Sequence, residues 1–196
     1  MARPREFDID QAVEKAMHIF WRYGFDASMP VLLDGMGLTR GSLYKAFYDK
    51  KTLFLRALER YENDVIRAGV ARLAGPALTD GEDRIMAMFS AVFDAINVQD
   101  RRGCLLCSVA SGAEMADPEI AAVVQDGLVI LRDGIEAALG QSSRHATLTH
   151  VRRRELADML LTHYIGLRIL SRSNLPSALS DNGLRQISDL LRVTCG

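Results

Sequence analysis

The chain has 196 residues, a formal net charge of −1, and a composition that is 48% apolar and 25% charged, which excludes an intrinsically disordered chain and suffices for one or two compact units. Polar or charged side chains interrupt the longest apolar runs, and the first residues lack the apolar core of a secretion signal, so we expect neither a membrane span nor export. Three cysteines are too few for a secreted disulfide framework, and a cytoplasmic location is therefore expected.

A first helix is predicted from Asp8 to Gly24. Asp8 and Gln11 have the spacing of a capping box, and Gly24 supplies a C-terminal stop. The apolar stripe of this helix consists of Val13, Ala16, Met17, Phe20 and Trp21. The segment before it carries Arg3 and Arg5, for which a frayed terminus is weighed against a phosphate or minor-groove contact.

Two short helices are predicted next, over residues 29–36 and 40–47. Ser28 and Thr39 are candidate N-caps because their hydroxyls can accept from unpaired amides of the first turn. Gly37 can adopt the positive φ that a tight turn between helices needs. The inward positions are Leu32, Leu33, Met36, Leu38, Leu43 and Phe47. This arrangement is typical of a helix-turn-helix.

The outward positions of the second short helix are basic, hydroxylic or aromatic. They are Thr39, Arg40, Gly41, Ser42, Tyr44, Lys45 and Tyr48. Such side chains donate to phosphates and base edges, and a glycine allows close backbone approach. Residues 37–60 contain six Lys or Arg and two Asp or Glu, which leaves a local charge of +4. Weighed against an ordinary solvated face, this pattern favours a surface that contacts a polyanion.

Every later predicted element is also helical, so the fold class is all-α. A long helix to about Leu73, stopped by Gly75 and Pro76, is some 22 residues or roughly 33 Å in length. One later helix is predicted to follow a Thr79-x-x-Glu82 capping box, and another to run from the N-cap Asp117 to Gly140. Three more are predicted over 104–114, 149–173 and 179–193. The polar segment 141–147 is expected to be mobile. No stretch of the sequence has the period-two alternation of a strand.

Cys104 and Cys107 stand three residues apart at a predicted helix start that follows two arginines. A helix N-terminus and nearby guanidinium groups both lower a thiol pKa, so a reactive Cys104 is weighed against a buried, inert one. An alternative function is an all-helical thiol oxidoreductase that uses Cys104-x-x-Cys107, although no histidine is close in sequence to relay protons. No further Cys or His pair has zinc-ligand spacing, and neither a metal nor a cofactor is expected.

The C-terminal part offers a candidate small-molecule cavity. Aromatic and sulfur-containing residues with a few polar tips are typical of such sites, and equally of a helical core. The candidates for the ligand or sensing site are Phe89, Phe93, Cys104, Cys107, Met115 and Tyr164. A dimeric binding protein without DNA recognition is a third alternative, but it would leave the basic face unexplained.

Residues 8–60 resemble the N-terminal domain of the TetR (tetracycline repressor) family. The residues that carry the resemblance are Phe20, Gly24, Phe25, Leu33, Met36, Gly37, Gly41, Ser42, Leu43, Tyr44, Phe47, Lys50, Leu53 and Phe54. They follow the order of the family and nearly its spacing, over about a quarter of the chain. Two departures are a single Ser28 where the family has a Thr-Ser pair, and Tyr48-Asp49 in place of a common Gly-Ser.

The resemblance implies an all-α subunit of about nine helices, with a DNA-binding domain over residues 1–50 and a ligand-binding and dimerisation domain over 51–196. It implies a transcriptional regulator and not an enzyme: a repressor that leaves a near-palindromic, double-stranded operator when a small-molecule effector binds. Base-edge contacts are expected from Arg40, Gly41, Ser42 and Lys45, and phosphate contacts from Ser28, Thr39, Tyr44, Tyr48 and Lys50.

The resemblance also implies a homodimer held by the last two helices. The expected interface residues are Leu156, Leu160, His163, Leu167, Leu184, Ile187 and Leu191. The run Arg102-Gly103-Cys104 is similar to a subset of the family in which a cysteine at this position senses electrophiles or oxidants. A thiol-reactive electrophile is therefore one expected class of effector.

Overall fold

A computed structural model describes residues 8–75, 79–173 and 177–193, and every element within these ranges is helical. The elements are α1 (Ile9–Tyr23), α2 (Met29–Met36), α3 (Arg40–Phe47), α4 (Lys50–Tyr61), α5 (Arg67–Leu73), α6 (Gly81–Asn97), α7 (Leu105–Ala110), α8 (Pro118–Gly140), α9 (His150–Leu170) and α10 (Ser177–Val193). Two short turns, π-helical Glu62–Ile66 and 3₁₀ Ala113–Ala116, complete them. The predicted arm with Arg3 and Arg5, Pro76 and Cys195 lie outside the described residues.

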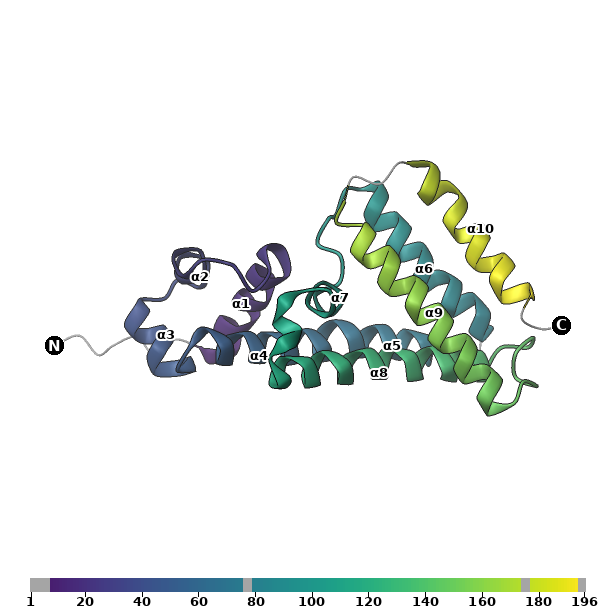
Figure 1. Ribbon diagram of the computed structural model, residues 1–196, viewed down its shortest axis with the longest axis horizontal. Helices are drawn as coiled ribbons and strands as arrows, with labels where there is room; N and C mark the ends of the chain where they lie inside the picture. Colours follow the sequence, from purple (N-terminus) through teal and green to yellow (C-terminus); the bar gives the residue numbers. More distant parts are fainter. Residues whose placement is uncertain (1–7, 76–78, 174–176, 194–196) are drawn as a thin grey trace.

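The all-α prediction is confirmed. The run α4, π turn and α5 is one continuous helix, and counting it once gives nine helices in the described part of the chain. Figure 1 shows α1, α2 and α3 gathered at one end, the α4–α5 run lying along α8, and α6, α9 and α10 side by side at the other end. No described helix has the length and apolar character needed to cross a bilayer.

The first three helices are held on α4 by a core of large apolar side chains. Phe20 and Phe54 meet edge to face with their ring centroids 4.8 Å apart. The other members of this core are Leu32, Leu43, Phe47, Leu53 and Leu58, each at most 1% exposed. Apolar burial of this kind fixes the angle between α2 and α3, because close-packed side chains leave the helices one arrangement.

Most predicted helix starts are confirmed by their caps. The Asp8 carboxylate accepts from the Asp10 and Gln11 amides, and the Asp117 carboxylate from the Glu119 and Ile120 amides. The prediction for α6 was wrong by one residue: its N-cap is Asp80, not Thr79. The other Asp80 oxygen accepts from the Ser143 amide at 2.8 Å, so this side chain joins α6 to the loop after α8.

The predicted long helix contains a π turn that the apolar spacing did not reveal. Tyr61 and Ile66 are both buried, yet residues five apart in an ideal α-helix point about 140° from each other. The wider π turn over Glu62–Ile66 brings both side chains to the core face. Such turns within α-helices are frequently found at functional sites.

The segment 141–147, expected to be mobile, is instead ordered around the buried side chain of His145. The Leu191 carbonyl can only accept, so His145 Nε2 donates to it across 3.0 Å, and His145 Nδ1 lies 3.0 Å from the Ser142 hydroxyl. The loop thereby anchors the end of α10. The expectation of mobility was wrong because sequence polarity does not show a partner 46 residues away.

Candidate nucleic-acid interface and effector cavity

The helix-turn-helix is built by caps and by a left-handed turn. The Ser28 hydroxyl accepts from the Val31 amide at 3.5 Å, and Gly37 ends α2 with φ of 69°. Thr39 Oγ1 accepts from the Ser42 amide at 3.2 Å and lies 2.9 Å from Ser42 Oγ. The caps predicted at Ser28, Gly37 and Thr39 are therefore confirmed, and they leave the first turn of α3 pointing outward.

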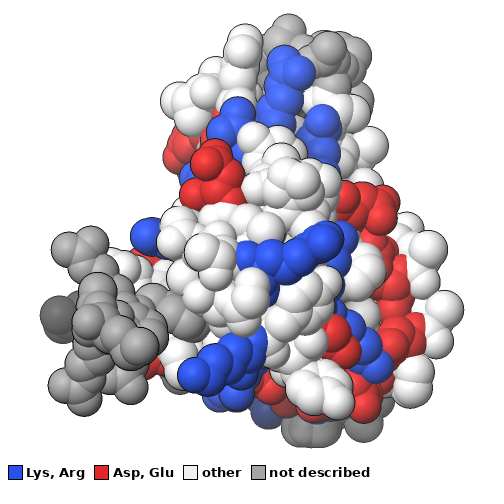
Figure 2. All heavy atoms as spheres, turned by 90° about the vertical axis from the view of Figure 1, so that its left-hand side faces the viewer, with Lys and Arg blue, Asp and Glu red and all other residues white. Residues whose placement is uncertain are grey.

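We call the outward side chains of α3 the reading face: Arg40, Gly41, Ser42, Tyr44 and Lys45. All are exposed except Ser42, which is half-buried. A Cβ added at Gly41 would meet no atom within 4 Å, so the space above this backbone is open to a partner molecule. Figure 2 views the end of the molecule that carries α2 and α3, where Lys and Arg side chains lie across the centre and Asp and Glu lie mainly toward the edges.

The turn between α3 and α4 projects one aromatic side chain into solvent. Tyr48 is 84% exposed and has φ of 67°, a conformation that residues with a Cβ rarely adopt. Such strained positions cluster at functional sites. The side chain of the next residue, Asp49, already caps α4. It accepts from the Thr52 amide at 2.7 Å, and this hydrogen bond lowers the pKa of its carboxyl group.

The basic residues after Tyr48 differ in what holds them. Lys50 Nζ lies 4.7 Å from the centroid of the Phe25 ring, a cation–π contact that positions the ammonium near the start of α4. Lys51 Nζ instead pairs with Asp117 Oδ2 at 2.7 Å and Glu119 Oε2 at 2.8 Å, at the start of α8. The local charge of +4 therefore overstates the cations available to a polyanion.

The N-terminal helices also contact the loop before α7. Trp21 Nε1 donates to the Gly103 carbonyl at 3.2 Å, and the Arg102 guanidinium lies 4.6 Å from the centroid of the indole. Tyr61 packs edge to face on the same indole at 4.9 Å. Two separate contacts, at Trp21 and at Lys51, thus join the helix-turn-helix end to the rest of the chain.

Cys104 and Cys107 lie directly behind this junction. Cys104 is the N-cap residue of α7, and both side chains are buried, at 1% and 0% exposed. Hydrogen bonding by Cys107, then by the Tyr61 hydroxyl, and the positive charge of Arg168 lower the pKa of Cys104. The same hydrogen bond between the thiols, together with burial, raises the pKa of Cys107. Cys104 is therefore the better thiolate of the pair.

A cavity of about 320 Å³ lies between the π turn with α5, α6, α8 and α9. Its apolar wall includes Val65, Ile66, Leu73, Met88 and Leu131. Of the predicted ligand residues, Tyr164 lines this cavity. Sequence reasoning missed its charged residues, Arg72, Arg84 and Arg168, because they come from three different helices and share no spacing.

The other predicted ligand residues lie elsewhere. Phe89 is fully buried and packs on the Tyr164 ring with centroids 6.3 Å apart, behind the cavity. The Phe93 ring packs against Gly183 of α10, where an added Cβ would lie 2.2 Å from the ring. Met115 is partly buried in the 3₁₀ turn. Among the described residues, no group of His, Cys, Asp or Glu is placed to hold a metal ion.

The residues predicted for the dimer interface divide into two groups. Leu156, Leu160, Ile187 and Leu191 are at most 3% exposed within one subunit, so their side chains support the helices from inside. Leu167 and Leu184 are partly buried, and His163 is exposed, with Nδ1 donating to the Met159 carbonyl at 2.9 Å. Direct contact with a second copy is therefore open to fewer of these residues than the sequence implied.

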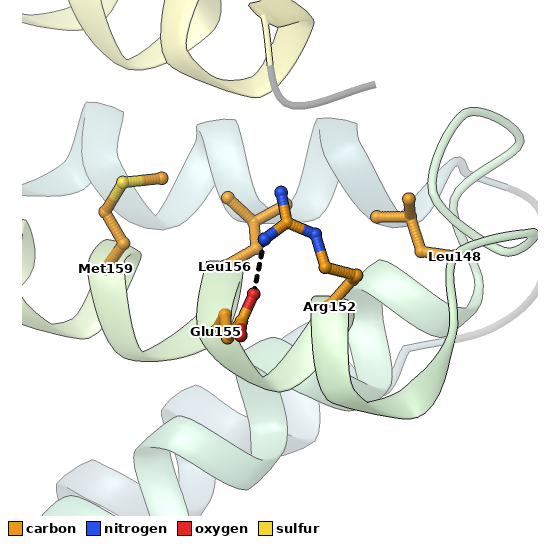
Figure 3. A pocket seen from close by; sticks show the side chains of 5 residues that line it. All are labelled: Leu148, Arg152, Glu155, Leu156 and Met159. Carbon is orange, nitrogen blue, oxygen red and sulfur yellow. Dashed lines mark hydrogen bonds and ion pairs between the residues drawn. The ribbon is translucent and has the colours of Figure 1, made fainter. Parts of the chain in front are cut away.

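A hollow lies along the first half of α9. Figure 3 shows its five lining residues, Leu148, Arg152, Glu155, Leu156 and Met159, with an ion pair joining Arg152 to Glu155. Farther along the same helix, Ile169 and Leu170 are 36% and 46% exposed. Apolar surface is thus exposed near both ends of α9.

The chain is similar to curated helix-turn-helix regulators, although no protein-family model matches it. It is 30% identical over 123 residues, 62% of either chain, to the uncharacterized HTH-type transcriptional regulator YezE of Bacillus subtilis. It is 33% identical over 120 residues to the HTH-type transcriptional repressor BdcR of Escherichia coli, covering 60% of this chain and 58% of that one. The matches thus span about three fifths of these relatives.

Several solved structures match nearly the whole chain. One of them is a cysteine mutant of the TetR family transcriptional regulator CifR, complexed with 26-bp double-strand operator DNA. The TM-score is 0.75, with 26% identity, and the match covers 97% of this chain and 98% of that chain. The architecture and the order of the helices are therefore shared from end to end.

Proposed function

We propose that this chain, which shares the fold and the helix order of TetR family transcriptional regulators, binds double-stranded operator DNA through the reading face. The observation that carries the proposal is the exposed first turn of α3, which is capped and has an open backbone at Gly41. An α-helix presented in this way fits the major groove. The CifR structure was solved with operator DNA, which supports the same use of this fold here.

The side chains take two roles in this proposal. Arg40, Gly41, Ser42 and Lys45 read base edges, because arginine and lysine match the acceptors of guanine and the glycine lets α3 approach. Five others hold phosphates, which fixes the register of the protein on the duplex. They are Ser28, Thr39, Tyr44, Tyr48 and Lys50. The Lys50 ammonium is suited to this role because the Phe25 ring positions it.

The test is footprinting on the DNA upstream of the gene for this chain, followed by affinity measurements over a salt series. Affinity should fall steeply with ionic strength, because bound cations displace counterions from phosphates. Arg40→Ala should weaken binding by about 1 to 3 kcal/mol and relax preference at one base step. Arg67→Ala, at an exposed arginine on α5, is the matched control. Equal binding by wild type and Arg40→Ala would remove Arg40 from the reading face.

We further propose that the protein works as a homodimer joined through α9 and α10 and binds a near-palindromic operator. Two reading faces related by a two-fold axis would meet half-sites about one helical turn of DNA apart or somewhat farther. The hollow on α9 and the exposed Ile169 and Leu170 support an interface there, since a second copy would cover apolar surface. In such a dimer the same surface of α9 and α10 on each subunit packs against its copy across the two-fold axis.

The regulator is proposed to be a repressor that an effector releases from DNA. One support is that BdcR is named a repressor. The other is geometric: the π turn and α5 wall the cavity, and they continue directly into α4, which begins at Lys50. If this helix can adopt two positions, a ligand that binds one of them more tightly raises the population of that position. The reading face then moves with the helix.

Chemical modification of Cys104 is a second proposed route to release. Its thiolate would attack the β-carbon of an enal, forming a C–S bond, while the former double bond takes a proton from solvent at the α-carbon. The lowered pKa and the contact with Tyr61 support this route, since Tyr61 packs on Trp21 of α1. The comparisons give no support to the alternative of a thiol oxidoreductase, because the similar proteins are named transcriptional regulators.

A further inference from the structure

The cavity has a charge pattern that indicates what kind of molecule it takes. Three guanidinium groups line it, from Arg72, Arg84 and Arg168, and none of the described residues that line it is an Asp or Glu. The remainder is mainly apolar, including Val65 and Ile66 of the π turn. Arginine is rarely buried without a paired anion, so a positively charged apolar cavity is an energetic anomaly unless an anion completes it.

Arg84 provides a fixed part of this positive charge. It is only 9% exposed, and its donors bind neutral acceptors: the Leu73 carbonyl at 2.7 Å, the Thr79 carbonyl at 2.5 Å and the Gln141 amide oxygen at 2.5 Å. These contacts satisfy hydrogen bonding, but they do not neutralise the charge. Arg84 therefore raises the potential in the cavity while its guanidinium stays in place.

Arg168 is positioned to bind a ligand directly. Its Nε donates to the Tyr164 hydroxyl at 3.0 Å, and the guanidinium lies 5.2 Å from the centroid of the Tyr164 ring. In the described part of the chain no carboxylate forms an ion pair with it. Because Tyr164 holds the Nε side, the pair of Nη groups remains as a planar fork. Such a fork matches the two oxygens of one carboxylate.

We propose that the cavity binds a small amphipathic molecule with a single carboxylate, which Arg168 holds and Arg72, an exposed residue, approaches from the solvent side. The apolar body of the ligand lies against Val65, Ile66 and Leu131. A phosphate head would call for more donors than one free fork, and each side-chain nitrogen of Arg84 already donates to an acceptor of the chain. The inference rests on the proposed function only in making this ligand the effector.

The location of the ligand explains how it could act. Its apolar body would touch the π turn, where the helix that continues α4 has its irregular segment. A ligand that packs better against one register of this turn would favour that register. The change would then travel along α4 to the start of the reading face.

The test is calorimetric titration of the full chain, without DNA, using four probes of equal chain length: octanoate, 1-octanol, octylamine and octyl phosphate. Wild type should bind octanoate about tenfold or more tightly than 1-octanol, the scale of a charge-assisted hydrogen-bond pair. Octylamine should bind least because its charge repels the three guanidinium groups. Equal affinity for octanoate and 1-octanol would overturn the proposal, and tighter binding of octyl phosphate would overturn the carboxylate assignment.

Three variants locate the head group. Arg168→Met should reduce the preference for octanoate over 1-octanol to about one, and Arg168→Lys should restore part of it, because the charge returns without the fork. Arg72→Met, at an exposed residue, should reduce the preference by a smaller factor and tests the proposal even if Arg168→Met does not fold. Arg152→Met, on the same helix but outside the cavity, should change nothing. An unchanged preference in both Arg168→Met and Arg72→Met would contradict the assignment.

DNA affinity measured in parallel separates this inference from the proposed function. Octanoate binding by a chain that does not bind its upstream DNA would leave the ligand assignment standing and the regulator proposal refuted. DNA binding by a chain that shows no preference for octanoate would leave the regulator proposal standing and the ligand assignment refuted.

Discussion

Neighbouring side chains decide which of the basic and thiol groups of this chain are available for chemistry. Lys50 and Lys51 are adjacent and identical in type, yet Lys50 lies over the Phe25 ring while Lys51 pairs with Asp117 and Glu119. The sequence identifies both lysines as basic but does not show that Lys51 is paired, because its partners lie on an element more than 60 residues away. The same holds for Arg72, Arg84 and Arg168, which only the fold brings together.

At this scale we predict that small electrophiles modify Cys104 and spare Cys107. Because the Cys104 pKa is lowered, its thiolate persists at lower pH than that of an ordinary thiol, so the modification rate should reach half its plateau below the usual pKa of about 8.5. Mass spectrometry of peptides after brief acrolein exposure over a pH series measures the rate.

Cys107→Ala serves as the companion variant. It removes the side-chain hydrogen bond that lowers the pKa of Cys104 most, so the midpoint should move toward higher pH. A folded wild-type protein whose Cys104 reacts with the same pH midpoint as the urea-unfolded chain would contradict the prediction.

At the scale of elements, local sequence predicted helix starts well and long-range packing poorly. The caps at Asp8, Ser28, Thr39 and Asp117 depend on residues within three positions, which a sequence displays directly. The π turn depends on which residues the core requires on one face. The order of segment 141–147 depends on a contact between His145 and the end of α10. Neither requirement is visible in a local pattern.

The start of α6 gives a prediction at the same scale. A Cβ at Gly81 would lie 1.8 Å from the Ala138 carbonyl oxygen, so Gly81→Ala must separate α6 from α8. Overpacking of this kind costs about 1 to 3 kcal/mol, and urea unfolding should show it. Gly41→Ala is the matched control, since the space around Gly41 is open and alanine is the better helix former. A Gly81→Ala chain as stable as wild type would show that the two helices are not in close contact there.

At the scale of the whole molecule, the nine helices of the described residues form two ends that share one long helix. The family resemblance predicted this plan, and the fold confirms the all-α architecture. The division after residue 50 stays a prediction: Leu53, Phe54 and Leu58 of α4 complete the core of the first three helices, so packing continues across that boundary.

Dimerisation is tested best at a position that the single subunit leaves open. Gly166 lies on α9 between the exposed His163 and Leu170, and a Cβ there would meet no atom within 4 Å. Gly166→Arg should therefore leave the subunit folded but block a second copy, so that sedimentation at micromolar concentration shows a monomer. Gly41→Arg, at the opposite end, should remain a dimer. A wild-type monomer, or a dimeric Gly166→Arg, would argue against an interface on this part of α9.

The contact between Trp21 and the loop before α7 has a practical consequence. The chain contains a single tryptophan, and its indole N–H donates to the Gly103 carbonyl while Arg102 lies over the ring. Indole emission responds to a nearby charge and to a hydrogen bond. The tryptophan fluorescence of the protein therefore arises entirely from the junction between the helix-turn-helix end and the body, so the native chain carries its own optical reporter of movement between them.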